Sequence, residues 1–180
     1  MTPAAGRFRL ASPRTALLLG GVVLALMAAL FPLGRLSHQG LSTSGGGAVL
    51  TPVFGAMGFV VAWRRPGNPL GWLMLGAAGF LVLSGDAGAY AVAGYRLHHG
   101  SLPLGWVAVL LQPGWAPAIA LFGLTVLLFP DGRPPSPRWR WMLWVYIAVA
   151  GAWVAGVFII SAGAILLAVF AFGSTLVSWP

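Results

Sequence analysis

The stretch TALLLGGVVLALMAALFPL, residues 15–33, contains no charged side chain and lies between Arg14 and Arg35. A helix needs about 20 mostly apolar residues to cross the bilayer's hydrocarbon layer of about 30 Å. The stretch is therefore predicted to be a transmembrane helix. A secretory signal peptide is the alternative, since Arg7 and Arg9 also precede the run. However, the run exceeds the usual apolar region of about 7–15 residues, and no small-residue cleavage site follows it.

Four further apolar runs follow along the chain, each bounded by Arg, Pro or Gly. They predict spanning helices at about 45–63, 71–95, 104–129 and 141–163. Residues 164–179 remain apolar and form either a tail or a short sixth span, with Ser161-Ala162-Gly163 as the break between two short spans. The expected fold class is all-α: residues 1–180 form one polytopic transmembrane helix bundle of about five spans, with four or six as alternatives.

The composition is unlike that of a soluble domain. Hydrophobic residues make up 59% of the chain and charged residues 7%, whereas about 25% of the residues in a soluble domain are charged. The acids are Asp86 and Asp131, and the absence of cysteine excludes disulfides and thiolate metal sites. The formal charge of +8 comes from arginines in short clusters. This distribution is typical of membrane topology signals and argues against nucleic acid as a partner.

The arginines also predict the orientation in the membrane. Lys and Arg resist translocation and accumulate in cytoplasmic loops. The N-terminal tail and alternate loops contain Arg7, Arg9, Arg14, Arg64, Arg65, Arg133, Arg138 and Arg140. The remaining loops contain only Arg35 and Arg96. We therefore expect a multi-pass protein of the cell membrane with its N-terminus in the cytoplasm.

Two of the arginine-rich loops have distinctive sequences. They read RRPGNPLGW at residues 64–72 and FPDGRPPSPRWR at residues 129–140, with two apolar runs between them. This pair resembles the N-terminal membrane region of a group of actinobacterial two-component sensor histidine kinases, over residues 60–144. The resemblance implies a membrane input module for signal transduction. We expect no kinase domain here, because the chain lacks the acidic residues that hold Mg²⁺-ATP.

The polar residues of these loops are candidate functional residues. The set comprises Arg64, Arg65, Asn68, Asp131, Arg133, Arg138 and Arg140. Asp131 lies in a Pro-Asp-Gly turn, where we expect it to pair with a neighbouring arginine. The arginines themselves are expected to set the topology and to contact anionic lipid headgroups.

Asp86 is the most informative residue inside a predicted span, because ionisable groups in a bilayer are costly and suggest a functional site. Helical rise places Asp86 roughly 13 Å below the outer end of its helix, at nearly the depth of Gln112 on the next span. Pro113 and Pro117 should disturb that second helix beside them. A polar pocket of Asp86, Gln112, Ser84 and Tyr90 is one interpretation. Interhelical hydrogen-bonding contacts without any ligand are the other.

No constellation of catalytic residues is recognisable, so we expect neither an enzyme nor a cofactor. His38, His98 and His99 are too few for a zinc site with three or four ligands. The function expected is a non-catalytic membrane sensory or anchoring module. Its partners would be the lipid bilayer and either a second copy or a membrane or kinase subunit. The alternatives are a subunit of a membrane transporter and a structural subunit of a larger membrane complex.

Overall fold

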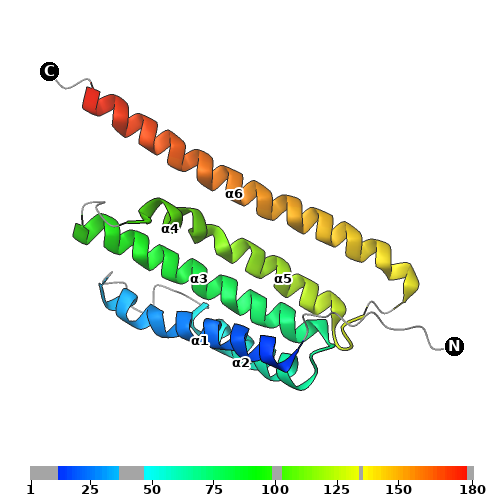
Figure 1. Ribbon diagram of the computed structural model, residues 1–180. Helices are drawn as coiled ribbons and strands as arrows, with labels where there is room; N and C mark the ends of the chain where they lie inside the picture. The colour runs from blue at the N-terminus through cyan, green and yellow to red at the C-terminus, as the bar shows by residue number, and fades with distance from the viewer. Residues whose placement is uncertain (1–11, 37–46, 99–102, 134–135, 178–180) are drawn as a thin grey trace.

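The computed structural model describes residues 12–36, 47–98, 103–133 and 136–177, and every regular element in these ranges is a helix. The prediction of an all-α protein is therefore confirmed. Figure 1 shows the arrangement of the elements. They are α1 (Pro13–Leu36), α2 (Gly47–Arg64), α3 (Pro69–His98), α4 (Gly105–Leu111), η2 (Gln112–Gly114), α5 (Trp115–Leu128), η3 (Pro137–Trp139) and α6 (Arg140–Val177).

Four helical segments are long and apolar enough to cross a membrane by length and composition. They are Pro13–Arg35, Pro69–Tyr95, Gly105–Leu128 and Arg140–Ala164, and Leu50–Arg64 is a shorter apolar helix beside them. These segments coincide with the five predicted runs to within a few residues. The structure therefore supports a helical bundle with four long apolar helices and a shorter fifth one.

The exposed faces of these helices are apolar. Leu18 on α1 is 71% exposed, Ile160 on α6 is 74% exposed, and between Arg140 and Ala164 no described side chain is buried. A soluble monomer rarely leaves such a large contiguous apolar surface uncovered. Lipid tails cover such a surface without cost, while the helical backbone satisfies its own hydrogen bonds. The chain thus has the character of an integral membrane protein.

Helix α3 is the centre of the bundle and packs against α1, α2, α4 and α5. Its closest contacts involve glycine, because a missing side chain lets two backbones approach. An ideal Cβ on Gly71 would lie 2.4 Å from the backbone nitrogen of Ala62 in α2. One on Gly58 of α2 would lie 2.6 Å from the backbone nitrogen of Leu75. Small residues therefore determine the α2–α3 interface.

The predicted disturbance at Pro113 is confirmed. Between α4 and α5 the chain forms a 3₁₀ turn, η2, at Gln112–Gly114, and regular α-helix resumes at Trp115. Proline lacks an amide hydrogen and clashes with the carbonyl four residues back, which explains why the α-helix is interrupted at this position.

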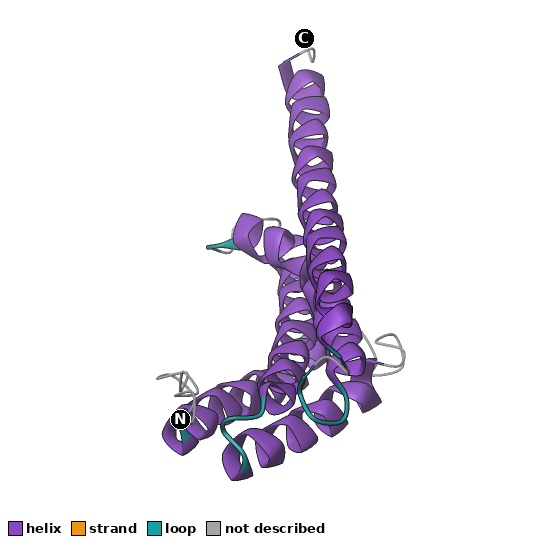
Figure 2. Cartoon of the chain, turned by 90° about the vertical axis from the view of Figure 1, so that its right-hand side faces the viewer, coloured by secondary structure: helices purple, strands orange, loops and turns teal. Residues whose placement is uncertain are grey.

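Helix α6 is a single helix of 38 residues, about 57 Å long at 1.5 Å per residue. The alternative of two short spans broken at Ser161-Ala162-Gly163 is wrong, because Ser161 lies within the helix and its hydroxyl donates to the Val157 carbonyl at 2.8 Å. The helix starts beside the end of α5 and extends beyond the other helices, as Figures 1 and 2 show. The first residue of α1, Pro13, and the last residue of α6, Val177, consequently lie at opposite ends of the molecule.

The first half of α6 is fixed to α5 by one tyrosine and one tryptophan pair. The hydroxyl of Tyr146 donates to the Ala120 carbonyl at 2.8 Å. A Cβ on Gly123 would lie 2.1 Å from the same hydroxyl oxygen. About two helical turns further along α6, the ring centroids of Trp115 and Trp153 lie 5.8 Å apart in an edge-to-face arrangement. Gly123 therefore provides the space that the tyrosine occupies.

Alanine at Gly123 should displace Tyr146 and remove its hydrogen bond to Ala120. The expected loss is about 0.6–1.7 kcal/mol, the range of interhelical hydrogen bonds in membranes. The measurement is thermal unfolding in detergent of G123A, Y146F and the double variant. The double variant should lose less stability than the two single variants together, since both remove one interaction. Fully additive losses would contradict the assignment, and G151A is the control because no atom lies within 4 Å of a Cβ there.

Candidate functional site

Ser84 and Gln112, two members of the candidate polar pocket, meet across α3 and η2. The Ser84 hydroxyl donates to the backbone carbonyl of Gln112. The Gln112 side chain lies against Gly88, where a Cβ would be 3.8 Å from its Nε2 atom. Tyr90 lies further along α3, and its hydroxyl donates to the Pro103 carbonyl at 2.6 Å. These three residues therefore connect α3 to the segment that carries the helix interruption.

Asp86 is not part of this set. Its side chain is buried, with 8% of the residue exposed, and neither carboxyl oxygen has a hydrogen-bond partner among the described residues. The expected pairing of Asp86 with Gln112 is therefore not formed. The reason is angular: residues two positions apart, such as Ser84 and Asp86, lie on nearly opposite sides of a helix. The depth estimate took account of the helical rise per residue but not of the side of the helix on which each side chain lies.

The register of the helices shows which neighbours lie level with Asp86. In the antiparallel α2–α3 pair, Cβ contacts join Gly71 to Ala62 and Gly55 to Ala78. The same spacing places Asp86 level with the start of α2 at Gly47. In the parallel α1–α3 pair, a Cβ on Gly85 would lie 3.4 Å from Leu30. Asp86 thus lies at the level where α2 begins and α1 approaches its end.

The face of α3 that carries Asp86 is otherwise apolar. Asp86 follows Val82 by four residues and Leu75 by eleven, spacings that keep the three side chains on one side of the helix. Val82 and Leu75 are each 1% exposed, and Leu75 packs with Val23 of α1. The carboxyl group therefore lies in apolar surroundings.

The two distinctive loops contact each other at one end of the bundle. Gly132 has φ +70, and a Cβ there would lie 2.6 Å from Asn68 Oδ1 and 2.7 Å from Pro69 Cδ. Asn68 Oδ1 also accepts from the backbone nitrogen of Leu70 at 3.0 Å, at the start of α3. Trp72 Nε1 donates to the carbonyl of Pro66 at 2.9 Å, which stabilises the first loop. We call residues 64–72, 129–133 and 136–140 the loop platform.

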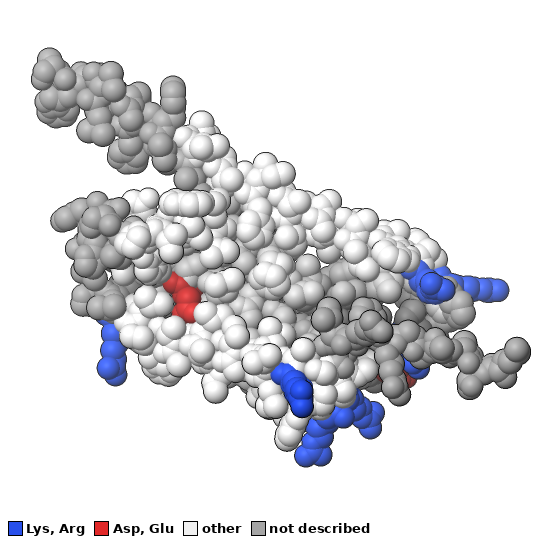
Figure 3. All heavy atoms as spheres, in the orientation of Figure 1, with Lys and Arg blue, Asp and Glu red and all other residues white. Residues whose placement is uncertain are grey.

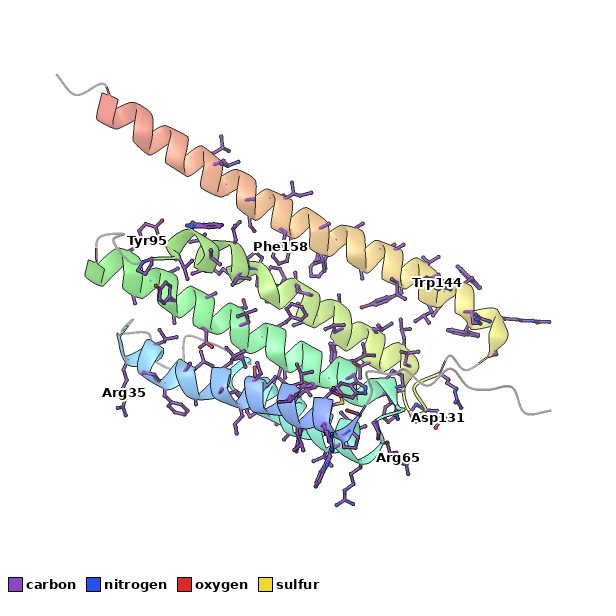
Figure 4. The ribbon with its side chains drawn as sticks, in the orientation of Figure 1. Arg35, Arg65, Tyr95, Asp131, Trp144 and Phe158 are labelled. Carbon is purple, nitrogen blue, oxygen red and sulfur yellow. The ribbon has the colours of Figure 1, made fainter. Side chains whose placement is uncertain are left out.

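The loop platform is strongly positive. Its five exposed arginines are Arg64, Arg65, Arg133, Arg138 and Arg140. Asp131 is also exposed, and no ion pair joins it to an arginine within the described parts of the chain. The expected Asp131–arginine pair is therefore not formed, which is consistent with the small gain of about 0–1 kcal/mol from exposed pairs. Figures 3 and 4 show most arginines at this end and Arg35 at the other.

No group of three or more His, Cys, Asp or Glu side chains among the residues that the structure describes lies close enough to hold a metal ion. His38 and His99 fall outside the described residues. Sequence reasoning missed the contact between the two loops, because it depends on a backbone conformation at Gly132. By contrast, the spacing of two residues between Ser84 and Asp86 was sufficient to predict that their side chains lie on opposite sides of the helix.

Comparison of the chain with protein-family models, with curated proteins and with solved structures gives no match. The site therefore has to be interpreted from its own geometry. It consists of two features at different depths: a buried carboxyl group without a partner, and a cationic platform built from two interlocking loops.

Proposed function

We propose that this chain is a non-catalytic sensory or anchoring module, multi-pass in the cell membrane with its N-terminus in the cytoplasm. In this proposal it is similar to the input region of an actinobacterial sensor histidine kinase. The observation that carries the proposal is the contact of Gly132 with Asn68 and Pro69. It joins the two loops that carry the resemblance into one surface, as expected if both serve the same partner.

The arginine distribution gives the loop platform its proposed role. Trp63, Trp139 and Trp141 are exposed at the same end as the five arginines, and tryptophan prefers the headgroup layer. The platform would therefore lie at the cytoplasmic membrane surface. A cytoplasmic kinase or response regulator would then contact the platform, where α6 starts at Arg140.

Photo-cross-linking from the platform tests this function. A photoreactive amino acid at Trp139, which is 49% exposed, should cross-link a histidine kinase or response regulator in native membranes. The same probe at Phe122, 48% exposed on the apolar face of α5, is the matched control. Adding the purified chain in nanodiscs should change the autophosphorylation rate of the captured kinase. A transporter subunit as the specific product would contradict the proposal, and an unchanged rate for a captured kinase would contradict the sensory role.

Single-cysteine variants test the orientation, and the absence of native cysteine makes the background clean. Cysteine at Gly67 or Ser136 should resist a membrane-impermeant thiol reagent in intact cells and react after the cells are opened. Cysteine at Ser101, which lies outside the described residues, should react in intact cells. The physical basis is the retention of arginine-rich loops in the cytoplasm. Labelling of Gly67 and Ser136 from outside would reverse the assigned orientation.

A further inference from the structure

The burial of Asp86 without a partner requires a compensating interaction. A charged carboxylate removed from water is very costly unless it is paired or hydrogen-bonded, and so buried groups of this kind neutralise or acquire a ligand. Asp86 is 8% exposed, and both of its oxygens lack a partner among the described residues. We propose that Asp86 is a proton-binding site between α1, α2 and α3.

Among the side chains that the structure describes, no cation of the surrounding helices pairs with Asp86. Helix α1 contributes Arg35, about one turn beyond the level of Asp86, and Figure 4 shows its side chain pointing away from α3. Arg14 at the start of α1 and Arg64 at the end of α2 lie at the other end of the bundle. The remaining packed elements, α4, η2 and α5, contain no titratable residue. On α3 itself, the Tyr90 hydroxyl already bonds to Pro103.

The accessibility of the site selects a proton over a larger cation. Each carboxyl oxygen of Asp86 exposes less than 1 Å², so an amine or guanidinium group has no room without helix movement. A metal ion such as Ca²⁺ takes about 6–8 oxygen ligands, and the described residues offer no cluster of acidic or imidazole side chains. A proton adds almost no volume and removes the charge. It is the ligand that fits the site as it stands.

Release of the proton to water converts the carboxylic acid to a carboxylate. The uncompensated charge would then attract Arg35, the nearest cation on a packed helix. Movement of Arg35 toward α3 would change how the end of α1 packs. As a signal, this step rests on the proposed function, whereas proton binding at Asp86 does not depend on it.

Infrared spectroscopy of the full chain in nanodiscs tests the site. Because the chain contains two acidic residues, side-chain ¹³C-labelled aspartate reports only on Asp86 and Asp131. A ¹³C-sensitive band of a protonated carboxylic acid should be present at pH 7. The band should persist in D131N, whose altered side chain is exposed in the loop, and disappear in D86N. No kinase is needed, so failure here and failure of the cross-linking experiment are distinguishable.

Further measurements distinguish a proton from a metal ion as the ligand of Asp86. The reference spectrum is recorded with choline as the cation of the buffer. Exchanging choline for Na⁺, K⁺ or Mg²⁺ should leave the acid band unchanged. Loss of the band on adding one of these ions would overturn the proposal in favour of a metal site. Absence of the band from the wild type, or its loss in D131N, would also overturn the proposal. Circular dichroism checks that D86N retains its helices. D131N and the wild type decide the question even if D86N does not fold.

Discussion

Alanine at Gly71 should destabilise the bundle more than alanine at any of the freely exposed glycines. The added Cβ would lie 2.4 Å from the backbone nitrogen of Ala62 and 2.9 Å from its Cα. These are backbone atoms, so no side-chain rotation relieves the overlap, and α2 would have to move away from α3. Overpacking of this kind typically costs about 1–3 kcal/mol and sometimes more. Separation of α2 would also open contacts further along the interface.

Thermal unfolding in detergent measures the effect, with G151A as the control. Gly151 lies within α6 and no atom lies within 4 Å of its added Cβ, so alanine there should be neutral or favourable by up to about 1 kcal/mol through helix propensity. G58A should resemble G71A, because its Cβ would lie 2.6 Å from the Leu75 nitrogen. Equal melting temperatures for G71A and G151A would show that α2 and α3 are not in close contact.

The helices were predictable from the sequence because lipid imposes a strict requirement on the backbone. Every amide in the hydrocarbon layer must bond within its own segment, so an apolar run of sufficient length indicates a helix. The run at residues 15–33 lies within α1 at Pro13–Leu36, and the run at 71–95 lies within α3 at Pro69–His98. Pro113 likewise predicted the interruption between α4 and α5 through its missing amide.

The length of α6 could not be predicted in the same way. Residues 141–179 contain no arginine and no proline to end a helix, and small residues at Ser161-Ala162-Gly163 suggested a break that does not occur. Glycine within a helix destabilises it by only about 1 kcal/mol relative to alanine. In lipid that cost is smaller than the cost of leaving backbone groups unpaired. The helix therefore continues through Gly163.

The candidate site was only partly predictable, because depth along a helix follows from counting but direction depends on packing. Counting placed Gln112 near the polar residues of α3, and the structure joins it to Ser84 by a hydrogen bond. The pairing that the depths predicted, Asp86 with Gln112, is wrong, since Asp86 lies on the face that it shares with Val82. The contact between the two loops had no sequence signal apart from Gly132, the residue type most tolerant of positive φ.

Valine at Gly132 should disrupt the loop platform through two separate effects. The φ of +70 is strained for any residue with a Cβ and more so for a β-branched one, at a cost of about 1–3 kcal/mol. The Cβ would also displace Asn68 Oδ1, which lies 2.6 Å away and caps the Leu70 nitrogen. Loss of such a cap typically costs about 1 kcal/mol. G132V should therefore lose clearly more stability than N68A, which removes only the cap.

Limited proteolysis reports the loss of the platform separately from unfolding of the bundle. Trypsin cleavage after Arg138 should be faster in G132V than in the wild type, because the second loop would no longer be held against Asn68 and Pro69. G67V is the matched control, since Gly67 lies in the same platform and no atom lies within 4 Å of its Cβ. Its cleavage rate should equal that of the wild type. Equal rates for G132V and G67V would mean that the two loops move independently, and the surface proposed to contact a cytoplasmic partner would not exist as one unit.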